Sequence, residues 1–363
     1  MKTINRRDFL KLVGLFATGG SILPQYLEAA VKDFPEKNTL WKGFNLLNKF
    51  NPDYQTPFEE EDFEFMAEWG FNFARIPLSY WCWSNADDWY SVDEECLKEI
   101  DRVVDLGKQY NIHINLNFHR VPGFCINPPF ENKNLFEDDD ALDACAYHWN
   151  VFAERYQGIQ PHVLSFNLLN EAPSIPDEKY DKVVRRLIKT IRDVNSERTI
   201  IVDGLDVGSR PLMTLTGENN IIQSGRGYQP MLISHYAANW VYGDDQMYFP
   251  KEQLGWPLRD GDKLYDKNWL RDTLRKNWDP WTAQNGRVHI GEFGCHNHTP
   301  HDVALAWLDD LLEVFEENHW GWALWNLKGS FGVLDSGRSD VNYENYKGHK
   351  LDRHMLELLT KER

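Results

Sequence analysis

The stretch VLSFNLLNE, residues 163–171, decides the fold. Side chains alternate between the two faces of a β-strand, so Leu164, Phe166 and Leu168 share one face and Glu171 ends the other. A strand with an apolar face and a terminal carboxylate is typical of a β/α barrel, in which inward side chains at the C-terminal strand ends perform the chemistry. We therefore expect Glu171 at the mouth of a barrel. A glutamate that only ends a strand is the alternative interpretation.

Short apolar strands alternate with amphipathic helices along the rest of the chain. We predict strands at residues 41–47, 72–77, 112–119, 163–171, 199–203, 231–235, 287–293 and 321–326. Between strands six and seven lies a long aromatic insert, residues 237–281, which we expect to be an active-site loop with short helices. Eight strands without a domain break predict a single α/β domain, a (β/α)8 TIM barrel. An open doubly wound sheet would need a glycine-rich phosphate-binding turn after the first strand, and the sequence has none there.

The amino-acid composition argues against some classes of binding partner. The 363 residues carry a formal net charge of −17, which argues against binding nucleic acid or an anionic membrane, because both would be repelled. The chain has 15 Trp, 15 Tyr and 20 Phe. Aromatic faces stack on sugar rings, although barrels also use such residues for packing. The five cysteines lack CxxC spacing, so no zinc knuckle or disulfide framework is readable, and we expect mostly buried thiols.

The N-terminus has the pattern of an export signal. In the segment NRRDFLK, Arg6 and Arg7 precede a modest apolar run, residues 12–23, which is too short to span a bilayer. This is the twin-arginine pattern, so we assign residues 1–30 to a twin-arginine export signal and residues 38–363 to the catalytic domain. The mature protein would then be periplasmic or secreted. An N-terminal anchor that is never cleaved is the alternative.

A second glutamate is placed like Glu171. Glu292 lies near the end of the predicted strand 287–293, and strands four and seven of a barrel face each other across its mouth. Retaining glycoside hydrolysis uses two carboxyl groups about 5–5.5 Å apart, one to protonate the leaving oxygen and one to attack the anomeric carbon. Their surroundings must separate their pKa values. Arg75, at the end of the second predicted strand, is placed to keep the nucleophile ionised.

Six motifs occur in an order that one enzyme family shares. They are ARIP with Arg75, LNFHR with His119, LLNEAP with Asn170 and Glu171, ISHY with His235, GEFG with Glu292 and ALWN with Trp325. The likeness extends from roughly residue 40 to residue 359. The ordered set resembles glycoside hydrolase family 5, the cellulase-like branch of the retaining (β/α)8 glycosidases.

The resemblance implies a mechanism and a substrate class. Glu171 would be the acid/base and Glu292 the nucleophile of a retaining β-glycosidase, which hydrolyses a β-glucan or related polysaccharide through a glycosyl-enzyme. The partner would be an oligo- or polysaccharide; no cofactor and no metal are implied, and we expect a monomer. The substrate-binding residues would be Arg75, Asn170 on the sugar 2-hydroxyl, Trp325 as the floor of the subsite, and His119 and His235, which orient sugar and carboxylates.

The sequence departs from the family pattern at one position. The family usually has a tyrosine two residues after the strand-six histidine, where it touches the nucleophile. Here that position is Ala237, and Tyr236 directly follows His235. A β-bulge would turn Tyr236 inward, and we name it for this role. Other candidates are Tyr228, Trp240 and Tyr242.

Two other functions are compatible with the sequence. A catalytically silent carbohydrate-binding barrel is disfavoured because both glutamates are intact. A metal-dependent barrel hydrolase would use the segment CHNH, residues 295–298, with His301, since closely spaced imidazoles chelate metals. Beside a strand end, such a segment more commonly shapes a cleft. Trp81, Trp83 and Trp89 would serve as sugar platforms or pack a loop. The identity of the sugar and the choice of endo or exo action depend on loops and stay open.

Replacing both Arg6 and Arg7 by lysine is expected to leave the protein in the cytoplasm with its N-terminal segment uncleaved, because the export receptor reads the arginine pair. Cell fractionation, with mass measurement of the accumulated protein, checks this. Unchanged export of the double variant would remove the twin-arginine interpretation.

Overall fold

Eight parallel strands close into a barrel in the computed structural model, which describes residues 40–243 and 254–363. Around the barrel the order is β1-β10-β9-β6-β5-β4-β3-β2. The strands are β1 (Lys42–Asn45), β2 (Phe73–Ser79), β3 (His113–Arg120), β4 (Leu164–Asn167), β5 (Thr199–Asp203), β6 (Ile221–Gly227), β9 (Arg287–Phe293) and β10 (Gly321–Leu324). The predicted (β/α)8 barrel is confirmed. The predicted export signal, residues 1–30, lies outside the described residues.

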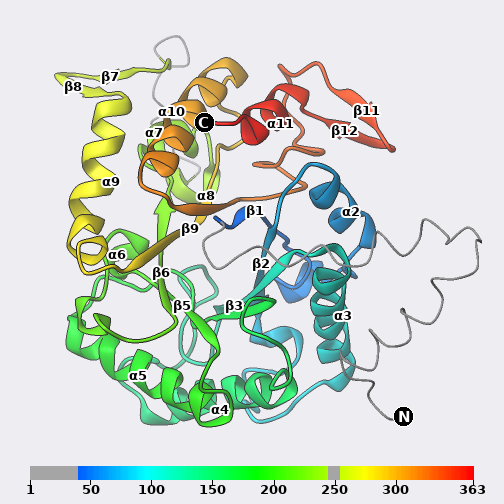
Figure 1. Cartoon of the computed structure of the whole chain (residues 1–363), viewed down its shortest axis with the longest axis vertical. Helices are drawn as coiled ribbons and strands as arrows, with labels where there is room; N and C mark the ends of the chain where they lie inside the picture. Colours follow the sequence, from blue (N-terminus) through cyan, green and yellow to red (C-terminus); the bar gives the residue numbers. More distant parts are fainter. Residues whose placement is uncertain (1–39, 244–253) are drawn as a thin grey trace, which may run out of the picture. The chain divides into compact units, whose positions relative to one another are not determined.

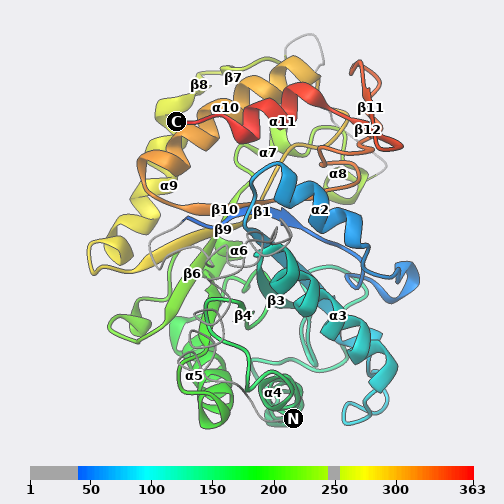
Figure 2. The ribbon, with the colours of Figure 1, turned by 45° about the vertical axis from the view of Figure 1, so that its right-hand side comes forward.

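Helices connect these strands and surround the barrel (Figure 1). The longer ones are α2 (Glu60–Glu68), α3 (Glu94–Tyr110), α4 (Asp139–Arg155), α5 (Asp177–Val194), α9 (Lys267–Thr282), α10 (His301–Glu317) and α11 (Arg353–Thr360). Three of them, α3, α9 and α11, have an aspartate cap at the first turn; at α3 the Asp93 carboxylate accepts hydrogen bonds from the N–H groups of Glu95 and Cys96. The last two helices, α10 and α11, lie side by side (Figure 2). Over both described ranges, no helix is long and apolar enough to cross a membrane.

Aromatic rings fill the N-terminal end of the barrel. The Trp41 ring stacks on His113 with 3.8 Å between centroids, and Phe73 lies 4.5 Å from His289. Burial lowers the pKa of both histidines to about 3, so they stay neutral at physiological pH and pack as aromatic rings. We call these four residues the aromatic plug. Polar side chains can therefore occupy the other end of the barrel. All five cysteine thiols are buried, as expected.

The sixth strand is not where the sequence pattern predicts it. Residues 231–235 were expected to form it, but Met231–Ser234 is a short helix, α7, that begins after Pro230. The strand is β6, ten residues earlier, with the sequence IIQSGRG. The apolar run MLIS is too short for periodicity to distinguish a strand from a helical turn. In β6 the glycines leave room for core rings, because a Cβ on Gly227 would come within 2.8 Å of Phe293 and Phe315.

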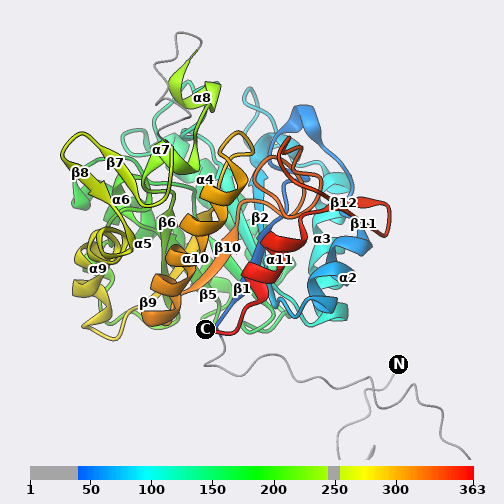
Figure 3. The same ribbon diagram turned by 90° about the horizontal axis from the view of Figure 1, so that it is seen from above.

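The segment predicted as a long loop contains regular structure. Residues 237–281 include the short helix α8 (Asn239–Tyr242), a hairpin of β7 (Leu258–Asp260) and β8 (Lys263–Tyr265), and nearly all of α9. In Figure 3, α8 projects at the upper edge of the ribbon, with α7 below it. Residues 244–253 of this segment are outside the described ranges. A second hairpin, β11 (Glu344–Tyr346) and β12 (His349–Leu351), precedes α11.

The close backbone packing at β1 can be tested by measuring how glycine substitutions change the stability of the protein. A Cβ built on Gly43 would lie 1.7 Å from the carbonyl oxygen of Phe73 on β2, whereas one on the exposed Gly158 would have nothing within 4 Å. Gly43→Ala is therefore expected to lower the free energy of unfolding by about 3 kcal/mol or more, since the strands must separate to admit the methyl group. Gly158→Ala should change it by less than about 1 kcal/mol. Urea denaturation measures both, and equal values would contradict the close approach.

Candidate active site

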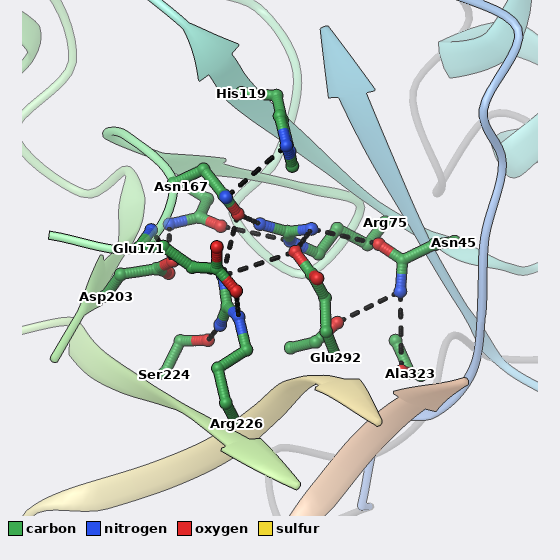
Figure 4. A network of polar contacts seen from close by, with 12 residues as sticks. Asn45, Arg75, His119, Asn167, Glu171, Asp203, Ser224, Arg226, Glu292 and Ala323 are labelled. Carbon is green, nitrogen blue, oxygen red and sulfur yellow. Dashed lines mark hydrogen bonds and ion pairs between the residues drawn. The ribbon is translucent and has the colours of Figure 1, made fainter. Parts of the chain in front are cut away.

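Polar side chains from six strands and the segments that follow them converge at the C-terminal end of the barrel (Figure 4). Nearly all of them are buried, and they form one continuous hydrogen-bond network. Its members are Asn45, Arg75, Asn167, Asn170, Glu171, Asp203, Ser224, Arg226 and Glu292. The network contains three carboxyl groups and two guanidinium groups.

The Glu292 carboxylate on β9 is held on both oxygens. Its Oε1 accepts a hydrogen bond from Nη1 of Arg75 at 2.7 Å, and Nη2 of Arg226 lies 3.3 Å from the same oxygen. Its Oε2 accepts a hydrogen bond from the Tyr228 hydroxyl at 3.1 Å. Two positive groups and one hydroxyl donor therefore favour the ionised carboxylate in a buried position.

Glu171 has the opposite surroundings. Its backbone adopts φ +51°, and its N–H donates to Oδ2 of Asp203 at 2.8 Å. The side chain accepts one hydrogen bond on Oε1, from Nε of Arg226 at 3.1 Å. Burial, together with the negative charge of Glu292, raises the pKa of Glu171 to about 7, although Arg226 opposes the increase. Glu171 therefore carries a proton over much of the acidic and neutral range, and it can act as an acid.

Asp203 joins three parts of the network. It ends β5, is fully buried, and accepts hydrogen bonds from the Asn167 amide at 2.9 Å and the Glu171 N–H at 2.8 Å. It also forms a close ion pair with Nη2 of Arg226. Neither Asp203 nor Arg226 is among the residues predicted from the sequence. The signal for Asp203 was present, because TIIVD is another apolar strand that ends in a carboxylate; Arg226 was missed because strand six was misplaced.

The orientation of the Asn170 amide is fixed by two arginines. Its Oδ1 accepts hydrogen bonds from Nη2 of Arg75 at 2.8 Å and from Nη2 of Arg226 at 2.7 Å. Guanidinium groups only donate, so the oxygen must face them and the Nδ2 group must face away. Nδ2 lies 3.4 Å from Nε2 of His119, at the cavity. Asn170 thus presents a donor on the side where a ligand would bind.

His119 and Trp325 line the wall of this cavity. His119 is buried beside Phe50, and burial together with Arg75 keeps its pKa well below the usual value, so the ring is neutral. Its Nε2 faces Asn170, whereas its buried Nδ1 has no protein partner among the described residues. Trp325 directly follows β10, and its ring lies 5.8 Å from that of His119.

A cavity of about 450 Å³ opens above the network. It brings together Glu171, Glu292, His119, His235 and Trp325, five of the residues singled out in the sequence. Other lining residues are Leu47, Phe50, Asn127, Pro128, Tyr228, Trp240, Ser330 and Phe331. Arg75 and Asn170 lie at the polar network below it.

Two sequence expectations about this region need correction. His235 follows α7 instead of lying on a strand; it forms part of the cavity wall, with Nδ1 2.8 Å from the Ser234 hydroxyl. Tyr236 was named for the contact with Glu292, but the hydroxyl on that carboxylate belongs to Tyr228, which comes directly after β6. Tyr236 instead packs beside the hydrophobic core. A bulge does occur beside this position, but its extra residue, Gly291, is on β9: Gly225 pairs with Ile290 and Arg226 with Glu292.

The remaining candidates have structural partners. Trp83 is buried in the core and its indole N–H donates to His148, so it packs its loop, and Trp81 lies under the Arg120 guanidinium. In the segment 295–298, the Cys295 thiol donates to a backbone carbonyl. Across residues 40–243 and 254–363, no three His, Cys, Asp or Glu side chains are grouped to hold a metal ion.

Comparison with known proteins gives concordant matches. The family model described as cellulase (glycosyl hydrolase family 5) matches residues 32–330. Endoglucanase C of Acetivibrio thermocellus is 25% identical over 311 residues, which cover 80% of this chain and 90% of the relative. Cellodextrinase A of Ruminococcus flavefaciens is 22% identical over 267 residues, with 72% and 75% covered.

Solved structures agree with this likeness. A crystal structure of a glycoside hydrolase is 37% identical with a TM-score of 0.82, and the match covers 89% of this chain and 99% of that one. Endoglucanase Cel5A of Thermotoga maritima, at 23% identity and a TM-score of 0.70 with 88% and 96% covered, shares the fold.

The raised pKa of Glu171 predicts a pH-dependent stability difference. A folded-state pKa of about 7 against an ordinary value of 4.5 means that ionisation above pH 7 costs the folded state about 3 kcal/mol. Glu171→Gln removes this cost. Its free energy of unfolding should therefore match the wild type near pH 4, exceed it increasingly between about pH 4.5 and 7, and stay above it by a constant amount from pH 7 to 8. Denaturant titrations measure both, with the exposed Glu178→Gln as control; parallel curves for Glu171→Gln and wild type would contradict the assignment.

Proposed function

The chain belongs to glycosyl hydrolase family 5, and from this membership we propose that it is a retaining β-glycosidase acting on a β-glucan or related polysaccharide. As a family member it is a glycoside hydrolase. The proposed retaining mechanism is supported mainly by the different surroundings of two carboxyl groups in one cavity. Glu292 is surrounded by donors that favour its charge, whereas burial favours the neutral form of Glu171.

In the first half of the proposed reaction, Glu292 attacks the anomeric carbon while Glu171 gives its proton to the leaving oxygen. The glycosidic C–O bond breaks, and an ester bond between the sugar and Glu292 forms. Arg75 and Tyr228 hold the attacking carboxylate in place. Because these contacts already exist without substrate, little reorganisation is needed at the moment of reaction.

In the second half, a water molecule attacks the same carbon from the side that the leaving group vacated. Glu171, now ionised, takes the water proton, and the ester to Glu292 breaks. Two displacements at one carbon retain its configuration. Both carboxyl groups return to their starting charge, so no cofactor is needed for the balance.

The cavity wall supports a sugar as the substrate. Trp325 offers an aromatic face at the cavity, His119 adds a neutral imidazole beside it, and the Nδ2 group of the buried Asn170 points toward His119. Two of the similar proteins are an endoglucanase and a cellodextrinase, which supports a β-glucan for this chain. Export by the twin-arginine route is part of the proposal, since a polysaccharide substrate lies outside the cell.

Azide rescue tests the division of roles. Glu292→Ala should abolish turnover of dinitrophenyl β-cellobioside, and azide should restore some of it with inverted product configuration. Glu171→Ala should lose about 10²–10⁴-fold on cello-oligosaccharides, yet still form the glycosyl-enzyme from the dinitrophenyl substrate, whose leaving group needs no protonation. Azide should then give a product of retained configuration.

Peptide mass analysis of the trapped intermediate completes this test. The covalent sugar is expected on Glu292, and its appearance on Glu171 would reverse the assignment. Wild-type products of inverted configuration would overturn the retaining mechanism altogether. Glu178→Ala, at an exposed position on α5, should behave as wild type throughout.

A further inference from the structure

We infer that Arg226 is a positioning residue with two tasks: it selects the Glu171 oxygen that carries the catalytic proton, and it supplies the second positive charge of the site. The inference rests on the proposed function, and it assigns a role to a residue that the family resemblance does not include.

Arg226 occupies the place where the resemblance implies a histidine. It lies on β6 two residues before Tyr228, which has the spacing expected of the strand-six histidine and tyrosine, and it pairs in register with Glu292 on β9. The neighbouring backbone makes room for it. A Cβ on Gly291 would lie 3.1 Å from Nη1 of Arg226 and 2.5 Å from the Ser224 hydroxyl oxygen. The strand ends thus fit around a large guanidinium group.

The guanidinium is fixed by partners on all three nitrogens. Nη1 donates to the Ser224 hydroxyl and to the Gly225 carbonyl, both at 3.1 Å. Nη2 donates to Asn170 at 2.7 Å and pairs closely with Asp203. Nε donates to Oε1 of Glu171. A planar group held in three directions has a single orientation, so its contact with Glu171 is set by the fold.

This contact decides where the Glu171 proton lies. An arginine side chain remains charged and offers only N–H donors, so the oxygen that faces it must be an acceptor. In neutral Glu171 the carbonyl oxygen is the stronger acceptor, so the contact with Arg226 favours Oε1 as the carbonyl oxygen and the proton on Oε2. Arg226 therefore leaves Oε2–H as the group that donates to the leaving oxygen. A histidine, which can accept as well as donate, would not impose this choice.

The charge of Arg226 balances both halves of the reaction. The site holds two cations, Arg75 and Arg226, against the three carboxyl groups of Glu171, Asp203 and Glu292. Before attack Glu171 is neutral and the other two are ionised, which gives zero net charge. After attack Glu292 is a neutral ester, and an ionised Glu171 restores zero. With Arg75 alone, each state would carry an uncompensated negative charge, and Glu171 would keep its proton when it must serve as base.

Arg226→Met is expected to move the basic limb of the kcat/KM profile on cello-oligosaccharides upward by about one pH unit, because the positive charge and hydrogen bond that favour ionised Glu171 are lost. In the glycosyl-enzyme the same loss leaves Glu171 protonated, so the hydrolysis of that intermediate should slow about 10-fold or more at neutral pH. A pre-steady-state burst with dinitrophenyl β-cellobioside should then be larger than that of the wild type. KM for that substrate should fall together with kcat, because slower hydrolysis of the glycosyl-enzyme makes this intermediate accumulate.

Arg226→Lys separates charge from geometry. It keeps the positive charge, so the basic limb should stay near the wild-type position, but a single ammonium cannot hold Glu171, Asp203 and Asn170 together and kcat should fall. Arg75→Met should move the basic limb less than Arg226→Met does, because Arg75 contacts Glu292 whereas Arg226 contacts Glu171 directly. Arg198→Met is the matched control for loss of a buried arginine: Arg198 donates to the backbone carbonyls of Tyr156, Ile159 and Leu164, and its loss should reduce stability without moving the limb.

The outcomes distinguish this inference from the proposed function. If no sugar adduct forms on Glu292 of the wild-type enzyme, both the proposed function and the role of Arg226 are overturned. If the wild type forms the adduct but the pH profile of Arg226→Met coincides with that of the wild type, only the role of Arg226 is overturned. The same conclusion follows if Arg226→Lys moves the basic limb as far as Arg226→Met does. If Arg226→Met does not fold because Asp203 is left unpaired, the double variant D203N/R226M removes the pair, and its basic limb should move in the same direction by a smaller amount.

Discussion

Two arginines buried among three carboxyl groups are the interaction on which the active end of this barrel depends. A buried ion without a partner costs several kcal/mol, so each charge must be matched by hydrogen bonds from a neighbouring strand end. Asn45 and Asn167 contact Arg75, and Ser224 contacts Arg226. The polar side chains that point into the barrel therefore supply the hydrogen bonds that hold these charged groups in position.

The two ends of the barrel divide structural and chemical tasks. At the N-terminal end, the aromatic plug packs neutral histidines between Trp41 and Phe73. At the other end the same strands carry the charge network, which opens into the cavity. Packing that fixes strand register at one end also fixes the relative position of Glu171 and Glu292 at the other, since side chains on paired parallel strands move together.

Much of this arrangement could be predicted from the sequence. The predictions that were wrong share one cause, the misplacement of strand six. The stretches around Glu171 and Glu292 combine an apolar face with a terminal carboxylate, which makes their strands and their placement recognisable. In β6, the inward positions hold polar groups that serve the network and the outward ones include glycines that serve packing, so the alternation of apolar residues disappears. The apolar run before His235 was taken for the strand instead, and Arg226 and Tyr228 were therefore overlooked as a pair.

The missing side chain at Gly291 links the evolution of neighbouring positions. A methyl group there would collide with the Ser224 hydroxyl and press on the Arg226 guanidinium. Alanine at 291 becomes compatible with the fold only after both neighbours have been replaced by smaller groups. Positions 224, 226 and 291 therefore constrain one another sterically, so the effect of a substitution at one of them depends on the side chains at the other two.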